Sequence, residues 1–100
     1  MNVKLIMTWD IQAGKEQDYF EFIGRHFIPT VTDLGLDLGD AWLTIYGQQP
    51  QILVSAIVSS QQKADKIVLS EEWQILHETL FDFVDNYILK IVPLKGAFQF

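Results

Sequence analysis

Residues 3–11, VKLIMTWDI, alternate between two kinds of side chain, and this alternation limits the folds that the chain can adopt. The odd-numbered positions are all apolar, whereas Lys4, Thr8 and Asp10 between them are polar. Successive side chains of a β-strand point to opposite faces, so a period of two indicates a strand that buries one face. We therefore expect residues 3–11 to form a strand in a sheet that is covered on at least one face.

Residues 12–34 change to the spacing of a helix. Their larger apolar side chains fall within one stripe when successive residues are turned by about 100°. The stripe contains Tyr19, Phe20, Ile23, Phe27, Val31 and Leu34. Pro29 lacks a backbone N–H, so we expect a kink near residues 25–29, and Gly35 is expected to end the helix.

Two further alternating runs indicate strands at residues 40–47 and 52–59. The turn-forming sequence GQQPQ joins them, and this arrangement predicts a hairpin. Residues 95–100 read KGAFQF and are expected to form a fourth strand.

Two helices are expected between the hairpin and that fourth strand. Ser59 or Ser60 is expected to cap a short helix through QQKADKIVL, because a serine hydroxyl accepts a hydrogen bond from the first helical turn. Ser70 is expected to cap a longer helix that continues to about Ile91, beyond which Pro93 prevents its extension.

The long elements follow the order β-α-β-β-α-β. No linker or low-complexity segment interrupts this order, so residues 1–100 are expected to form a single domain. The order is that of the ferredoxin-like α+β fold, an antiparallel four-stranded sheet with both helices on one face.

The sheet face that the helices leave uncovered is predicted to carry large apolar side chains. A face in contact with water would carry mainly polar residues, so we expect a second sheet to cover it. The chain is therefore predicted to form a homodimer through its sheet. The predicted interface residues are Ile6, Thr8, Trp42, Tyr46, Leu53 and Ile57.

The composition argues against several classes of partner and site. The chain has 7 Lys and Arg against 13 Asp and Glu, a net charge of −6, and its basic residues do not cluster. Nucleic acids and anionic membranes need a basic surface, so neither is an expected partner. The absence of cysteine excludes disulfides and thiolate metal sites. No apolar run reaches membrane-spanning length and no signal peptide is evident, so a cytoplasmic location is expected.

Two stretches, TWDIQAGKEQDYFEFI and LSEEWQIL, place an aromatic-rich helix after a Gly-Lys turn and a tryptophan at a helix start. Both resemble the dimeric α/β-barrel superfamily, in which two ferredoxin-like subunits pair their sheets. Among its families, the chain is most similar to the NIPSNAP-type and antibiotic-biosynthesis-monooxygenase-type proteins. The resemblance covers the topology of the whole chain and implies the fold. It does not fix an activity, because the superfamily contains oxygenases, heme enzymes, isomerases and proteins without known chemistry.

A cleft between the helices and the sheet is the predicted ligand site. The resemblance implies a small apolar or aromatic ligand there. If the protein is an enzyme, it implies a cofactor-independent, monooxygenase-like reaction in which a tyrosine or His77 polarises the ligand. The predicted ligand-binding residues are Trp9, Tyr19, His26, Trp73, His77 and Tyr87.

His77 has two further interpretations. Heme-degrading members of the superfamily bind iron through a histidine on this helix, so the resemblance implies heme binding through His77 as an alternative. They also use an asparagine near the first strand, whereas Asn2 and Asn86 both fall outside residues 3–11. The second alternative is a packed histidine, hydrogen-bonded to a backbone or hydroxyl group, in a non-catalytic structural or regulatory dimer.

The other candidates also have simpler interpretations. His26 lies at the margin of its helical stripe and is then a surface residue. The tryptophans and tyrosines are then packing residues whose polar tips each need one partner. Two histidines without a supporting carboxylate are too few ligands for zinc or iron, so no metal site and no resident cofactor are predicted.

Overall fold

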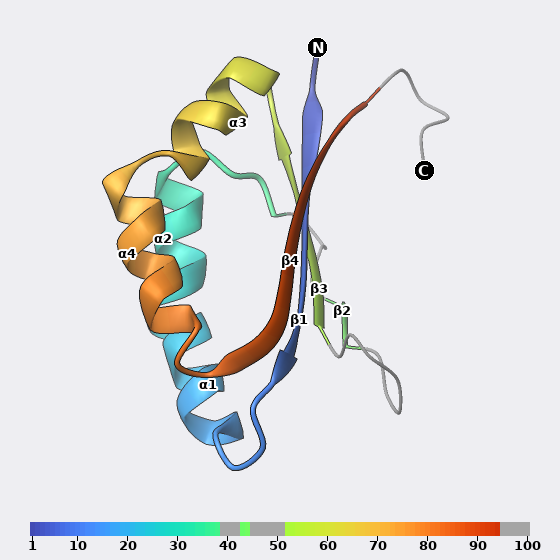
Figure 1. Ribbon diagram of the computed structural model, residues 1–100. Coiled ribbons are helices and arrows are strands. Elements are labelled where there is room, and N and C mark those ends of the chain that lie inside the picture. The colour runs from blue at the N-terminus through green and yellow to red at the C-terminus, as the bar shows by residue number, and fades with distance from the viewer. Residues whose placement is uncertain (39–42, 45–51, 95–100) are drawn as a thin grey trace.

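A computed structural model describes residues 1–38, 43–44 and 52–94 (Figure 1). The strands form one antiparallel sheet in the order β2-β3-β1-β4. Their bounds are β1 (Val3–Ile11), β2 (Leu43–Thr44), β3 (Ile52–Val58) and β4 (Val84–Pro93). This strand order and the antiparallel pairing are those of the predicted ferredoxin-like fold, which is confirmed.

The helices all lie on one face of this sheet (Figure 1). Three segments follow one another directly: α1 (Glu16–Phe22), the π-helical η1 (Ile23–Phe27) and α2 (Ile28–Asp33). The second half of the layer contains α3 (Gln61–Val68) and α4 (Glu71–Leu80). Within the described segments, no helix has the length and apolar character needed to cross a bilayer.

Alternation in β1 and β3 places the core between the sheet and the helices. Leu5 pairs with Ala56 and Met7 pairs with Val54 across the two strands, and all four side chains are buried. Trp9 is also fully buried. The alternation of residues 3–11 and 52–59 therefore separates a buried face from the other face of the sheet, as predicted. Burying a large apolar side chain contributes about 1.5–3 kcal/mol, so this layer is the main source of stability.

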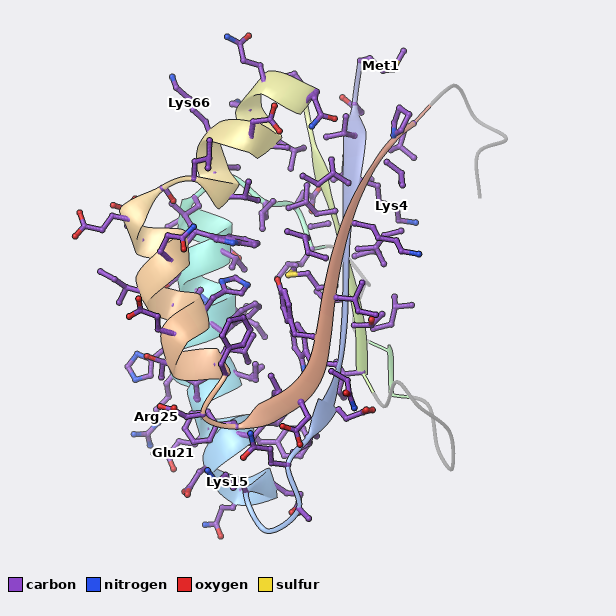
Figure 2. The ribbon with its side chains drawn as sticks, in the orientation of Figure 1. Met1, Lys4, Lys15, Glu21, Arg25 and Lys66 are labelled. Atoms are coloured by element: carbon purple, nitrogen blue, oxygen red, sulfur yellow. The ribbon has the colours of Figure 1, made fainter. Side chains whose placement is uncertain are left out.

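No helix of the described residues lies on the opposite face of the sheet (Figure 1). Ile6 and Leu53 are half-buried there, whereas Ile57 is 41% exposed and Ile88, from β4, is 53% exposed. Figure 2 shows the Lys4 side chain on this same side of the sheet, away from the helices. We call this surface the open face.

Four of the residues predicted for the dimer interface lie on the open face: Ile6, Thr8, Leu53 and Ile57. Thr8 is placed there because it alternates with the buried residues of β1. Trp42 and Tyr46 lie outside the described residues. The homodimer itself stays a prediction.

A kink was predicted near residues 25–29, and the structure has a π-helical turn there, over Ile23–Phe27. The Ile28 N–H donates to the carbonyl of Ile23, five residues earlier, in place of the usual four. Because Pro29 has no N–H to donate, the α-helical ladder is interrupted at this point, and the wider turn precedes α2. The predicted burial of Phe20 is wrong, since its side chain is 57% exposed. Phe22 is buried instead, because positions i+3 and i+4 from Tyr19 face the core.

The predicted helix ends are confirmed at three other places. The hydroxyl of Ser60 accepts from the Lys63 N–H, and the hydroxyl of Ser70 accepts from the Trp73 N–H, so both serines are N-caps. Gly35 has a φ of 107°, a conformation that favours glycine, and it follows the last residues of α2.

The predicted extension of the last helix to Ile91 is wrong. Helix α4 ends at Leu80, and the chain returns through a turn to form β4, which occupies the place expected for residues 95–100. Those six residues lie outside the described part of the chain. The segment after residue 83 is rich in β-branched side chains, which lose rotamer freedom in helices and pack well in strands. Pairing with β1 therefore overrides the helical spacing.

Candidate functional site

His77 is the only histidine in the described residues that is buried, with 5% of its surface exposed. Its Nδ1 lies 2.9 Å from the backbone carbonyl oxygen of Trp73, one helical turn earlier on α4. Its Nε2 lies 2.9 Å from the hydroxyl oxygen of Tyr87 on β4. The expectation of a packed histidine bonded to a backbone or hydroxyl group describes these contacts correctly.

These two partners define the protonation of the ring. A carbonyl oxygen only accepts, so Nδ1 carries the hydrogen and donates it to Trp73. The Nε2 of the neutral ring then has a lone pair and accepts the hydrogen of the Tyr87 hydroxyl. The arrangement is a directed chain from the Tyr87 O–H to Nε2 of His77, and from Nδ1–H to the carbonyl of Trp73.

A β-bulge positions Tyr87. Thr8 pairs with Ile88 and Asp10 pairs with Asp85, so two residues of β4, Asn86 and Tyr87, stand opposite Trp9 alone. Asn86 has a φ of 58°, which asparagine tolerates better than most residues, and its side-chain amide donates to the Asp10 carboxylate at 2.9 Å. Bulges of this kind redirect side chains. Here the bulge lies beside the residue that meets His77.

Aromatic rings surround His77. The Trp73 ring stacks on it with a centroid separation of 4.1 Å, and Tyr87 contacts it edge-on at 5.3 Å. Phe27 and Phe81 approach at 5.7 and 6.0 Å, also edge-on. Phe27 belongs to η1, Trp73 to α4 and Tyr87 to β4, and Phe81 directly follows α4. Three elements therefore meet around one imidazole.

Trp9 extends this group into the sheet. Its ring stacks on Tyr87 at 5.9 Å with an interplanar angle of 11°, and its Nε1–H donates to the Tyr19 hydroxyl at 2.8 Å. We call Trp9, Tyr19, Trp73, His77 and Tyr87 the inner cluster. It contains every tryptophan and tyrosine side chain that the structure describes. The structure therefore brings together five of the six predicted ligand-binding residues.

Burial shifts the proton affinities of the inner cluster. Burial lowers the pKa of His77 below 6.5, and the hydrogen bond to the Trp73 carbonyl opposes that shift. Burial raises the pKa of Tyr19 to about 12, against a smaller opposing effect of the Trp9 hydrogen bond. Burial also raises the pKa of Tyr87. At neutral pH all three side chains are therefore uncharged.

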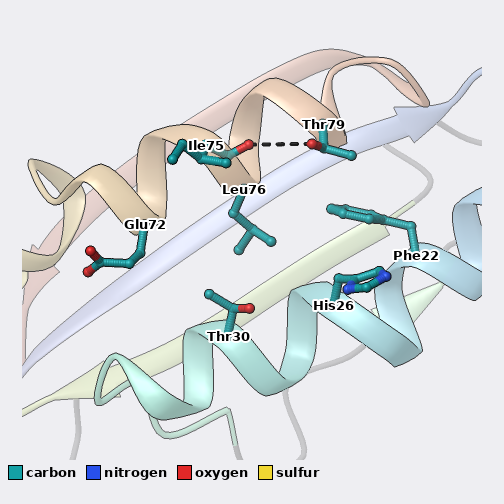
Figure 3. Close-up of a pocket in the computed structure, with 7 residues that line it drawn as sticks. All are labelled: Phe22, His26, Thr30, Glu72, Ile75, Leu76 and Thr79. Atoms are coloured by element: carbon teal, nitrogen blue, oxygen red, sulfur yellow. Dashed lines mark hydrogen bonds between the residues drawn. The ribbon is translucent and has the colours of Figure 1, made fainter.

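His26, the sixth predicted residue, does not join the inner cluster. It is exposed on η1 and faces a groove between the α1–η1–α2 helix and α4 (Figure 3). This outer groove has a volume of about 430 Å³. Its lining residues are Phe22, His26, Thr30, Glu72, Ile75, Leu76 and Thr79. The surface interpretation of His26 is thus correct: His26 is exposed, whereas His77 is buried.

Sequence reasoning missed Phe27 and Phe81 as neighbours of His77. The helix that it predicted to continue to about Ile91 would have placed Val84 and Ile88 near His77 on one helix. Both residues belong to β4, and Ile88 lies on the open face. The alternation of Tyr87, Leu89 and Ile91 was the signal for a strand. The distance between His77 and Tyr87 depends on the register of β4 against β1, which no local pattern specifies.

The inner cluster does not fit heme. Iron would need the Nε2 lone pair of His77, which accepts from Tyr87, and the porphyrin would need the space that the Trp73 ring fills at 4.1 Å. Among the described side chains, no three of His, Asp and Glu are grouped closely enough to hold a metal ion.

Several solved structures share this fold. A NIPSNAP family protein from Agrobacterium tumefaciens has a TM-score of 0.70 at 19% identity, over 99% of this chain and 97% of that chain. An ethyl tert-butyl ether D family protein from Bacillus halodurans has a TM-score of 0.72 at 17% identity, over 95% and 100%. An antibiotic-biosynthesis-monooxygenase-like protein from Nitrosomonas europaea has a TM-score of 0.66 at 10% identity, over 97% and 90%.

These neighbours confirm the resemblance to NIPSNAP-type and antibiotic-biosynthesis-monooxygenase-type proteins at the level of the fold. The sequence matches no family model and no curated protein. Since all three identities are low, the shared fold does not by itself carry an activity to this chain.

Proposed function

We propose that the protein is a homodimer that binds a small, apolar or aromatic molecule between its helices and its sheet, with a ligand oxygen placed against Tyr87. The observation that carries this proposal is the buried hydrogen-bonded chain from Tyr87 through His77 to the Trp73 carbonyl. Packing alone does not require it, because phenylalanine and leucine would fill such positions without burying polar atoms. Buried titratable pairs of this type are common at functional sites.

Tyr87 can accept a hydrogen bond from a ligand while it donates to His77. Its hydroxyl oxygen has lone pairs beyond the one O–H that His77 accepts. The residue is half-buried, whereas His77 behind it is buried. A ligand hydroxyl would therefore meet Tyr87 first, and His77 would act through Tyr87.

This order of contacts supports a proton relay. A ligand O–H would give its proton to the Tyr87 oxygen as Tyr87 gives its own proton to Nε2 of His77. The products are a ligand oxyanion and an imidazolium whose Nδ1–H still donates to Trp73. An electron-rich oxyanion of this kind is the species that a cofactor-independent oxygenase activates toward dioxygen, so the relay supports monooxygenase-like chemistry.

Proton affinities narrow the class of ligand. An ordinary phenol has a pKa of about 10, so full transfer to a histidine with a pKa below 6.5 is uphill by more than about 5 kcal/mol. The relay therefore suits a molecule with an acidic hydroxyl, such as the enol of a diketone or a phenol with electron-withdrawing substituents. A simple phenol would bind without losing its proton.

The open face supports the homodimer. Ile57 and Ile88 are exposed there beside half-buried Ile6 and Leu53, an apolar surface that water alone does not favour. A second copy would cover these side chains with its own open face. The neighbouring Lys4 and Lys90 would then remain at the margin or in a hydrated interior.

Native mass spectrometry of gently purified protein tests this proposal. We expect a dimer that carries extra mass, released on denaturation. The Tyr87→Phe variant keeps the aromatic ring and loses the hydroxyl, so it is expected to stay dimeric and to lose the extra mass. His26→Gln is the matched control, because His26 lies outside the inner cluster, and it should retain the adduct.

Three results would contradict the proposal. A monomer would contradict the proposed homodimer. An adduct that persists in Tyr87→Phe would show that the ligand does not bind at Tyr87. If wild type carries no adduct and binds no acidic phenol or enol from a test panel, the inner cluster is packing in a non-catalytic dimer. Hemin titration separates the heme alternative, since a Soret band that disappears in His77→Ala would show iron bound through His77.

A further inference from the structure

The outer groove has the composition of a binding site that is separate from the inner cluster. Figure 3 shows its residues facing one another from the two helices. Phe22 and Leu76 form an apolar floor, each with 7% of its surface exposed, and the 54% exposed Ile75 adds an apolar edge. A volume of about 430 Å³ lies within the range of small-molecule sites.

A second hollow of about 350 Å³ continues the outer groove toward the start of α1. The two share Phe22, His26 and Thr79, so they form one trough along the helix layer. The residues that only the second hollow adds are Asp18, Glu21, Arg25 and Phe83. Phe22 therefore lies where the two hollows meet.

The fixed charges of the trough are predominantly negative. Glu21 is neutralised by Arg25, whose Nη1 lies 3.2 Å from its carboxylate on the exposed helix surface. Asp18 and Glu72 are left as unbalanced carboxylates at the two ends. No lysine or arginine of the described residues lies within salt-bridge distance of Glu72.

We propose that the outer groove binds small amphipathic amines, with the apolar body on Phe22 and Leu76 and the ammonium group beside Glu72. An apolar floor provides most of the binding free energy, and a carboxylate at one end selects a cation over an anion. Thr30, on the facing helix, provides a hydroxyl oxygen that can accept a further hydrogen bond.

This site is independent of the proposed function, because none of the inner-cluster residues lines the trough. The outer groove lies between the two helices, and Figure 3 shows the sheet behind them. Tyr87→Phe is therefore expected to leave amine binding unchanged. A protein that binds amines in the outer groove but no ligand at Tyr87 would contradict only the proposed function. The reverse result would contradict only this inference.

Titration with hexylamine, followed by amide chemical shifts in the ¹⁵N-labelled protein, tests the inference. The largest shifts are expected at residues of η1 and α4 that line the groove. Hexanoate and hexanol are matched probes with the same apolar chain and a negative or no charge. We expect both to bind at least threefold more weakly than hexylamine.

Two variants isolate the carboxylate. Glu72→Gln removes the charge with little change of shape and should weaken hexylamine binding by about threefold to fivefold, as expected for a partly exposed ion pair. Glu71→Gln is the matched control, because Glu71 occupies the same first turn of α4 and does not line the groove. It should leave the affinity unchanged.

The inference is overturned if hexanoate or hexanol binds as tightly as hexylamine, or if both glutamate variants weaken binding equally. Shifts centred on the inner cluster, or no saturable shifts at millimolar hexylamine, would also overturn it.

Discussion

The inner cluster and the outer groove differ in the burial of their polar side chains. In the inner cluster, the indole of Trp9 and both nitrogens of His77 have protein partners, and no buried side-chain polar atom of the described residues lacks one. In the outer groove, His26 and Glu72 face solvent. Burial makes the inner hydrogen bonds costly to lose, whereas exposed groups can be changed with little effect on folding. Changes in the inner cluster are therefore expected to affect both stability and the proposed function. Changes in the outer groove are expected to leave stability nearly unchanged.

The largest expected effect is that of Trp9→Ala. Trp9 is fully buried and contacts Tyr19, Phe27 and Tyr87, so its truncation leaves a large cavity. We expect a loss of about 3–5 kcal/mol in the free energy of unfolding, measured with urea. Phe20→Ala is the control, since Phe20 is 57% exposed, and should cost less than about 1 kcal/mol. Equal losses in the two variants would contradict the assigned burial.

Tyr87→Phe is expected to have the next largest effect on stability. The ring remains, but Nε2 of buried His77 loses its donor, which costs about 1–3 kcal/mol. Adding His77→Leu should cost less than its effect in the wild-type background, because the two side chains share one hydrogen bond. A double-mutant cycle by urea unfolding measures this coupling. Strict additivity would show that the hydrogen bond contributes nothing.

The pH dependence of stability tests the burial of His77. Burial lowers the pKa of His77 below 6.5, so the unfolded chain binds a proton that the folded chain resists. The free energy of unfolding is therefore expected to decrease as the pH falls through 6.5, and to be unaffected by His77 well above that value.

Urea unfolding between pH 7.5 and 5.5 gives the slope. His77→Gln should flatten it. The same slope in His77→Gln and wild type would show that His77 does not resist protonation.

The smallest expected effect is that of Glu72→Gln on stability. Glu72 is exposed at the edge of the outer groove, so its change should alter the free energy of unfolding by less than about 0.5 kcal/mol. Glu71→Gln should match it, because both residues lie in the first turn of α4. A loss above about 1 kcal/mol for Glu72→Gln alone would mean that the outer groove contributes to the core.

Much of the fold follows from local patterns. The period of two at residues 3–11 and 52–59 specified the buried face, and the serine caps marked where α3 and α4 begin. The last strand was hidden, because Leu80, Val84, Ile88 and Ile91 also satisfy a helical period. No glycine or proline separates α4 from β4, so the change of structure has no local marker.

The sequence predicted which residues form the candidate site, but not the hydrogen bonds between them. The orientation of His77 toward the sheet followed from its helix, and its burial confirms it. The hydrogen bond from Tyr87 depends on strand register and on the bulge at Asn86. Both are long-range properties, which the pattern around either residue does not contain.

The central claim is that Tyr87 donates to a neutral His77 held in one tautomer, and ¹⁵N NMR of the histidine rings tests it most directly. At neutral pH we predict a protonated Nδ1 and an unprotonated, hydrogen-bonded Nε2 for His77, and a change at Nε2 in Tyr87→Phe. A protonated Nε2, or averaging between tautomers as expected for exposed His26, would contradict the account.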